Sequence, residues 1–272
     1  MIITHAHGSC HQHANGNFSD QSPAVMREVM RLLRDGKPFG WMRWADAEML
    51  EGVHLRDTVR KFEHIDSLVV NVGVWWLCDD RLRSGWNAAV PADLDFVFHD
   101  FFYLPTGIPD DDARDMWDGL GIRGWVRTAH EVGRKLAVIG PRHLQTIPWL
   151  RGADYIEAGQ MLSSVRRYNE VLSRAKSVSA KHADEPVLFV LSAGSGAKVL
   201  IVDMMSSPEN KDMFVDVGAS LDGFAGVHSR AFNSGEEFIR KYCENILRED
   251  PWHMDLWLSP GVCPEHRLTL DN

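Results

Sequence analysis

The chain has 272 residues, of which 29 are Lys or Arg and 38 are Asp or Glu, so its formal net charge is −9 at pH 7. Hydrophobic residues make up 44% of it, which is enough to bury one large globular core. The negative charge argues against a protein that binds nucleic acid mainly through its phosphates, because that mode of binding needs a basic surface. An anionic small ligand would need a locally positive pocket, formed by a metal ion, by helix N-termini or by a few cations.

Beyond the polar, histidine-rich N-terminus, the longest stretches without charge, 67–78 and 186–197, are too short to cross a bilayer as a helix. The N-terminus is polar and rich in histidine where an export signal would be apolar. We therefore expect no membrane span and a cytoplasmic location. Residues 1–21 are expected to form a histidine-rich N-terminal arm, and residues 22–272 a single α/β domain.

The clearest predicted helix covers residues 22–36. Ser22 can cap it, Pro23 suits its first position, and apolar residues recur at helical spacing until Gly36. A short apolar run at 39–44 then predicts a strand.

The pattern is less regular between residues 55 and 130, where apolar runs stand at 67–77 and 96–103 and an Asp-rich turn at 109–115 is expected to open a helix. From residue 135 onward, strands and helices alternate. Strands are predicted over 136–140, 155–156, 186–192 and 213–217, and helices after His143, over 160–181 and from a glycine turn to Met205. This alternation predicts a Rossmann-like α/β fold, with a mostly parallel sheet and helices on both faces.

The glycine turn at 193–197 joins a buried strand to the next helix. Glycines let the backbone approach a ligand, and a helix N-terminus offers amide groups to a phosphate. Four residues are therefore assigned to nucleotide binding: Gly194, Ser195, Gly196 and Ala197. Lys198 is left out, because a lysine at this position can point into solvent. Val199 stands where the dinucleotide fingerprint needs its third glycine, and a tight turn that binds nothing is the alternative.

Two carboxylates, Asp46 and Glu48, follow the strand predicted at 39–44, and Arg43 precedes them. Carboxylates at this spacing can present oxygen atoms to a divalent metal, and the arginine can face phosphate oxygens. An ordinary helix start, where acids are favoured by the helix dipole, is the alternative. A second pair, Asp93 and Asp95, competes for the same role but stands before an apolar run rather than after one.

A third motif begins at Asp216, at the end of the strand predicted over 213–217. Gly218, Asp222 and His228 follow within a segment that holds three glycines in nine residues. Such a segment is typical of a loop held close to a ligand or to other backbone, and a plain surface loop is the alternative.

Together these motifs resemble the GT-D glycosyltransferases, a family that was formerly a domain of unknown function. Arg43-Trp-Ala-Asp46-Ala-Glu48 is similar to the Arg-Phe-Gly-Asp-Gly-Glu signature of that family. The strand and turn at 187–198 and the Asp-x-Gly at 216–218 are similar to its nucleotide-binding portion. The resemblance implies a metal-dependent enzyme that transfers a sugar from a nucleotide diphosphate, usually UDP, to a hydroxyl group.

The resemblance also implies residue roles. Asp46 and Glu48 would bind Mn²⁺ or Mg²⁺ near the donor sugar, and Arg43 would hold phosphate oxygens with the amides of the glycine turn. Asp216 and Gly218 would belong to the nucleotide site. Independently of the resemblance, we expect Asp222 to supply a second carboxylate that either contacts the metal or accepts the proton of the acceptor.

The chain departs from the family pattern in two places. Ala219 stands where family members carry a histidine, so Asp222 or His228 would have to replace that residue at the metal. Ala45 and Ala47 stand where the family has glycines, which requires negative φ at both positions. The acceptors implied by the resemblance are glycans and glycosylated proteins, and a hydroxylated nucleobase is a further alternative.

Two other enzyme classes stay open. A methyltransferase that uses S-adenosylmethionine also has a glycine turn after a strand and an acid after the next, but its turn follows the first strand of the sheet. A metal-dependent amidohydrolase would use His5 and His7 after the apolar Ile2-Ile3, with later ligands such as His99, His143 and Asp216. The predicted elements do not supply the eight units of its barrel.

Overall fold

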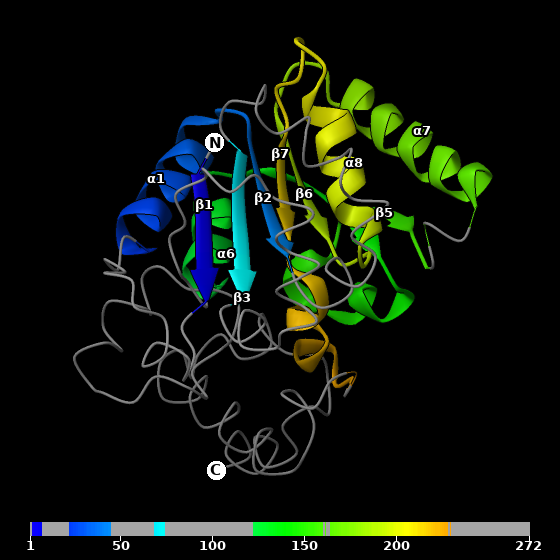
Figure 1. The fold of residues 1–272 in the computed structure, drawn as a ribbon, viewed down its shortest axis with the longest axis horizontal. Coiled ribbons are helices and arrows are strands. Elements are labelled where there is room, and N and C mark those ends of the chain that lie inside the picture. Colours follow the sequence, from blue (N-terminus) through cyan, green and yellow to red (C-terminus); the bar gives the residue numbers. More distant parts are fainter. Residues whose placement is uncertain are drawn as a thin grey trace, which may run out of the picture.

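The computed structural model of the protein describes seven parallel strands that form one sheet, with helices on both faces (Figure 1). This confirms the predicted Rossmann-like α/β fold. The structure describes residues 2–6, 22–44, 68–73, 122–159, 161, 164–227 and 229.

The strands stand in the order β1-β3-β2-β7-β6-β4-β5. Their bounds are β1 Ile2–Ala6, β2 Phe39–Trp44, β3 Leu68–Gly73, β4 Lys135–Gly140, β5 Asp154–Glu157, β6 Val187–Leu191 and β7 Met213–Asp216. Residues of the expected N-terminal arm therefore take part in the sheet, because β1 pairs with β3. All strands run in one direction, so their carboxyl ends meet at one edge, the lower edge in Figure 1.

Four α-helices and four short 3₁₀ helices lie among the described residues. The α-helices are α1 Ser22–Asp35, α6 Ile122–Glu131, α7 Val165–Lys181 and α8 Gly196–Met205. The 3₁₀ helices are η4 Arg142–Thr146, η5 Pro148–Leu150, η7 Gly218–Leu221 and η8 Gly223–Ala225. None of the described helices combines the length and the apolar character needed to cross a membrane.

The two faces of the sheet bury separate cores. Alternate residues of β6 show this division, since Leu188 and Val190 belong to one core and Phe189 and Leu191 to the other. The first core contains residues of α1, α6, η4 and η5, and the second contains residues of α7 and α8. Every residue of β6 is buried, as expected for an interior strand of a sheet covered on both faces.

The predicted helices after β4 and before β6 differ from the observed ones at their boundaries. The segment after His143 forms η4 and η5 instead of an α-helix, because Pro148 keeps Ile147 before it extended. Helix α7 begins at Val165 rather than at residue 160. Ser164 caps it there, with its side chain accepting a hydrogen bond from the backbone N–H of Arg167 at 3.1 Å.

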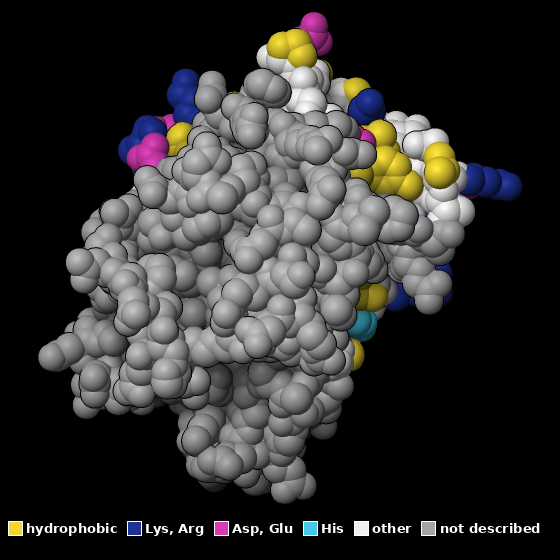
Figure 2. Space-filling view, viewed as in Figure 1, with side chains coloured by type: hydrophobic (Ala, Val, Ile, Leu, Met, Phe, Trp, Pro, Cys, Tyr) yellow, Lys and Arg dark blue, Asp and Glu magenta, His cyan; other side chains and the backbone are white. Residues whose placement is uncertain are grey.

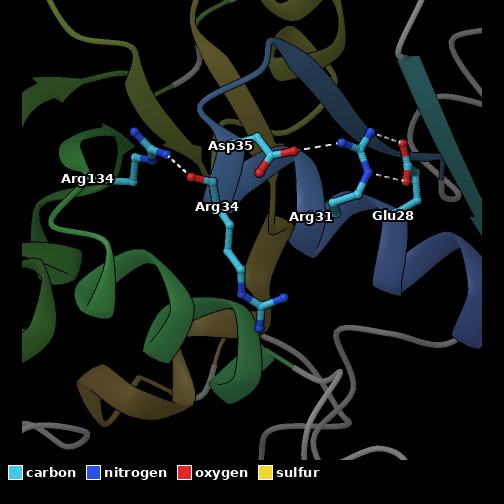
Figure 3. A network of polar contacts seen from close by, with 5 residues as sticks. All are labelled: Glu28, Arg31, Arg34, Asp35 and Arg134. Carbon is cyan, nitrogen blue, oxygen red and sulfur yellow. Dashed lines mark hydrogen bonds and ion pairs between the residues drawn. The ribbon is translucent and has the colours of Figure 1, made fainter.

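Arg134 holds the C-terminal end of α1 (Figure 3). Its guanidinium donates from Nε to the carbonyl oxygen of Leu33 at 2.9 Å, and a second nitrogen donates to the carbonyl of Arg34. Gly36 ends the helix with φ +64°, and Lys37 N donates to the Leu32 carbonyl, so the carbonyls of Leu32, Leu33 and Arg34 all accept hydrogen bonds. The side chain of Arg134 thereby ties α1 to the start of β4.

Basic and acidic side chains lie together over α1, and Lys or Arg side chains project at the far end of α7 (Figure 2). On α1, Arg31 bridges Glu28 and Asp35 at 2.7 Å each, on the exposed side of the helix (Figure 3). On α7, the guanidinium groups of Arg167 and Arg174 donate to the backbone carbonyls of Glu157 and Tyr155, at 3.1 Å each. These two carbonyls belong to β5, the edge strand of the sheet.

Candidate active site at the carboxyl edge of the sheet

The connections that leave β4 and β6 diverge at the carboxyl edge. The segment after β4 packs with α1 and α6 on one face, whereas α8, after β6, packs on the opposite face. Because β4 and β6 are neighbours and their connections go to opposite faces, their carboxyl ends mark a switch point of the sheet, the position at which open α/β sheets bind ligands. The predicted glycine turn and the motif after β7 both lie at this edge.

The glycine turn after β6 leads directly into α8. Gly194 has φ +58°, which favours glycine, and α8 begins two residues later at Gly196. The amide of Ala197 donates to the carbonyl of Gly194 at 3.1 Å, so a phosphate would compete with that bond for this amide. Ser195 stands at the N-cap position, without a side-chain cap bond.

The backbones of β4 and β6 come close together where the turn begins. Ser192 N donates to the Ile139 carbonyl at 2.8 Å. A Cβ atom placed on Gly140 would lie 2.9 Å from Leu144 Cδ1 and 3.1 Å from the Ser192 carbonyl oxygen. Only glycine fits at position 140 without displacing these neighbours.

Lys198 and Asp216 form a buried ion pair behind the turn. Lys198 Nζ lies 2.6 Å from Asp216 Oδ2, and both residues are at most 3% exposed. The same Nζ donates to the Gly194 carbonyl at 3.2 Å, and Asp216 Oδ1 accepts a bond from Gly218 N at 3.0 Å. Lys198 therefore does not point into solvent. The predicted nucleotide-binding residue Asp216 has no exposed surface, and its carboxylate orders the chain around the turn.

Asp222 and His143 form a second polar pair at the same edge. Asp222 Oδ1 lies 2.7 Å from His143 Nε2, and Asp222 Oδ2 accepts a hydrogen bond from Ser229 Oγ. The Asp222 side chain is 6% exposed and that of His143 is 28% exposed. The carboxylate is thus buried between two donors, while part of the imidazole ring reaches solvent.

The His143–Asp222 contact crosses the end of β6. His143 lies in η4, after β4, and Asp222 lies between η7 and η8, after β7. Strand β6 separates β4 from β7 in the sheet, and η4 contacts η8. Leu144, Leu221 and Phe224 share the core of the α1 face, so the pair stands on that side of the β6 end, opposite to α8.

Ser229 donates to Asp222 and not to His143, so the three residues do not have the order of a nucleophilic Ser-His-Asp triad. His143 and Asp222 resemble the His–Asp part of such a triad, in which a buried carboxylate holds the imidazole ring in one orientation. When Nε2–H of a neutral His143 donates to Asp222, the lone pair is on Nδ1. The sequence pattern had indicated His143 only as a ligand of an amidohydrolase. Its position just after β4 was the available signal for a role at this edge.

Several predicted residues lie outside the described part of the chain. These are Asp46, Glu48, Asp93, Asp95, His228, His7 and His99. For Arg43 and His5 the backbone alone is described, in β2 and β1 respectively. Strand β2 is a parallel neighbour of β7, so the chain enters the Asp46–Glu48 motif beside the end of β7.

Of the metal ligands expected for a glycosyltransferase, which are Asp46, Glu48, Asp222 and His228, the structure describes Asp222. Both of its carboxylate oxygens accept hydrogen bonds, which suits a residue that orients His143 better than it suits a metal ligand. Within the described residues, no group of three His, Cys, Asp or Glu side chains is placed to hold a metal ion.

The comparisons with known proteins add no family assignment. No protein-family model matches the chain, and no curated protein or solved structure is significantly similar to it.

Proposed function

We propose that the protein is a glycosyltransferase that moves a sugar, a hexose in our proposal, from a UDP-linked donor to a hydroxyl acceptor. The observation that carries this proposal is the convergence of the glycine turn after β6 and the His143–Asp222 pair at the edge where the β4 and β6 connections diverge. The motif that resembles the GT-D signature follows β2, which is adjacent to β7.

The proposed donor site uses the turn and the end of β2. The diphosphate would lie at the N-terminus of α8, with amides of Ser195 and Gly196 and the charge of Arg43 toward its oxygens. The buried ion pair of Lys198 and Asp216 stabilises this site, because Lys198 also donates a hydrogen bond to the Gly194 carbonyl in the turn. Gly218 anchors Asp216 through its amide. In this proposal Asp216 positions the turn and does not contact the nucleotide.

A divalent cation, Mn²⁺ or Mg²⁺, would be held by Asp46 and Glu48, and when bound it supplies Lewis-acid stabilisation of the departing diphosphate. We assign Asp222 to His143 and not to this cation, because both of its oxygens are already hydrogen-bonded. The acceptor would be a glycan, a glycosylated protein or a hydroxylated nucleobase.

A methyltransferase is the second proposal that the glycine turn permits. It would need an acid at the end of the next strand to bind a ribose. Asp216 occupies that position, but its side chain is fully buried and paired with Lys198, which favours the glycosyltransferase.

Ligand-induced thermal stabilisation tests the proposal. The full chain is heated with UDP, UDP-glucose, GDP or S-adenosylmethionine, each with Mn²⁺, with Mg²⁺ or with EDTA. We expect UDP-glucose with Mn²⁺ to raise the melting temperature by several degrees, because ligand at about 100 times its Kd stabilises by about 2.7 kcal/mol. Stabilisation by S-adenosylmethionine alone would favour the methyltransferase. Zn²⁺ without any nucleotide is a further arm of the experiment, and stabilisation by Zn²⁺ alone would favour the amidohydrolase.

A further inference from the structure

We propose that His143 is the catalytic base of the glycosyl transfer and that Asp222 is its positioning residue; this inference rests on the function proposed above. The sequence assigned acid–base chemistry to Asp222 itself. The structure places Asp222 in a buried position, with its two oxygens accepting from His143 and from Ser229. The more exposed member of the pair is the imidazole, so the imidazole is the group that an acceptor can reach.

The burial of Asp222 has a chemical consequence for His143. A buried carboxylate between two donors is fixed in place, and it fixes the imidazole through the 2.7 Å contact at Nε2. It also stabilises the imidazolium that forms when the ring takes a second proton. The pair therefore holds Nδ1 ready to accept a proton.

The position of the pair fits a donor bound at the glycine turn. Ser192, the first residue after β6, bonds to Ile139 and lies against Gly140, so the turn begins beside the segment that carries His143. The turn leads to α8 on one side of the β6 end, and the His143–Asp222 pair stands on the other side. A diphosphate on the turn and an acceptor on His143 would meet across the carboxyl end of β6.

The proposed step is a single displacement. The acceptor oxygen forms a bond to the anomeric carbon of the donor sugar, while His143 Nδ1 takes the proton of the acceptor hydroxyl. The bond between the anomeric carbon and the diphosphate oxygen breaks, and the diphosphate leaves with the electron pair. The imidazolium later returns its proton to solvent. One displacement inverts the anomeric centre, so an α-linked donor gives a β-linked product.

His143→Gln tests the role of the base, because the glutamine amide can still donate to Asp222 but cannot accept the proton. A matched control is His182→Gln. His182 Nε2 lies 2.7 Å from Asp154 Oδ2, and its side chain is 20% exposed, so it belongs to an equivalent His–Asp pair outside the proposed site. Transfer is measured with UDP-glucose, and donor binding is measured by thermal shift with Mn²⁺.

We expect His143→Gln to lower kcat on the order of 10²–10⁴-fold, the usual contribution of a general base, while the thermal shift from the donor stays unchanged. His182→Gln should leave both kcat and the thermal shift from the donor unchanged. Asp222→Asn should lower kcat and leave the KM for the donor unchanged, as expected of a positioning residue. In His143→Gly, added imidazole should restore part of the activity, which a purely structural histidine would not allow.

The outcomes separate the two proposals. Absence of donor binding and of transfer in the wild type overturns the proposed function and this inference with it. Transfer by the wild type together with a full rate in His143→Gln overturns the inference alone. A product with retained anomeric configuration also overturns it. If His143→Gln fails to fold, absence of imidazole rescue in a folded His143→Gly overturns the inference in the same way.

Discussion

Lys198 and Asp216 come from the first turn of α8 and the last residue of β7, and their charged atoms meet at 2.6 Å without access to solvent. Each partner also contacts backbone of a loop: Lys198 at Gly194 and Asp216 at Gly218. The pair therefore joins the two loops that we assign to the donor site.

We predict that Lys198→Met lowers the free energy of unfolding by about 3–5 kcal/mol, because it leaves the buried Asp216 carboxylate without its counter-charge. Urea denaturation measures this change. Adding Asp216→Leu should recover much of the loss, since a pair of apolar residues leaves no buried charge. The surface pair of Lys181 and Asp154 is the control, and Lys181→Met should cost less than about 1 kcal/mol. Equal losses in the two lysine variants would contradict the prediction.

Gly140→Ala should disturb the packing between the carboxyl ends of β4 and β6. The added Cβ would stand 2.9 Å from Leu144 Cδ1 and 3.1 Å from the Ser192 carbonyl oxygen, so the buried Leu144 side chain must shift and the Ser192 carbonyl must give way slightly. We expect a loss of about 1–3 kcal/mol in stability, as for overpacked cores, together with a smaller thermal shift from UDP-glucose. Gly159→Ala is the control, because nothing lies within 4 Å of its Cβ position. An unchanged melting temperature in Gly140→Ala would show that the site tolerates a side chain.

Gly36→Ala and Gly133→Ala separate backbone strain from crowding. Both glycines have positive φ, +64° and +62°, so alanine costs about 1–2 kcal/mol at either position. At Gly36 the new Cβ would also lie 3.1 Å from the Arg134 guanidinium that caps α1, whereas at Gly133 it meets nothing within 4 Å. Thermal melts should therefore show the larger loss for Gly36→Ala. The reverse order would argue against the cap described for Arg134.

The stability of the protein should depend on pH through Asp154. Its hydrogen bond with Lys181, and then that with His182, hold the pKa of the Asp154 carboxyl below its ordinary value of 3.8. A lowered pKa in the folded state adds stability that is present above the unfolded value and is lost as pH falls through the folded value. The pH range in which this stabilisation is lost therefore lies below about pH 4.

Asp154→Asn should make the free energy of unfolding fall less steeply in that window than it does in the wild type. Urea denaturation at pH 5 and at pH 2.5 measures the difference. Lys181→Met should flatten the slope too, because it removes the largest cause of the lowered pKa. Identical slopes in wild type and Asp154→Asn would show that this carboxylate does not carry the effect.

Substitution of Glu48 tests the proposed metal dependence. If the cation binds Asp46 and Glu48, Glu48→Ala should lower transfer from UDP-glucose on the order of 10²–10³-fold, because Lewis-acid stabilisation is worth several kcal/mol. The melting curve without ligand should stay nearly unchanged. Glu185→Ala, at an exposed position before β6, is the control. Full activity of Glu48→Ala, or of the wild type in excess EDTA, would remove the metal from the proposal.

The fold was predictable where local signals agreed with the tertiary structure. Pro23 and Gly36 marked the ends of α1, and the apolar run at 187–191 marked the buried strand β6. Proline chemistry interrupted the helix expected after His143, because Pro148 follows only five residues later. Strand β1 was assigned to an arm, because histidines obscured its apolar pattern, and its place in the sheet depends on pairing with β3, more than sixty residues away.

The candidate site was predictable in location but not in its contacts. Asp222 and the glycine turn were found because acids and glycines follow strands. The sequence did not indicate that His143 is the partner of Asp222. His143 lies 79 positions earlier in the chain and contacts Asp222 only because β4, β6 and β7 are neighbours in the sheet. Lys198 has the sequence pattern of an exposed helix residue, and only the register of β7 brings Asp216 against it.

Two arginines of α7, Arg167 and Arg174, occupy hydrogen-bonding groups at the β5 edge of the sheet. The outer carbonyls of Glu157 and Tyr155 in β5 already receive guanidinium donors from Arg167 and Arg174. A strand from another chain that sought to extend the sheet at β5 would have to displace both arginines before it could pair. Helix α7 thus protects the β5 edge from strand addition, and the all-parallel sheet can expose β5 at its margin without offering a template for aggregation.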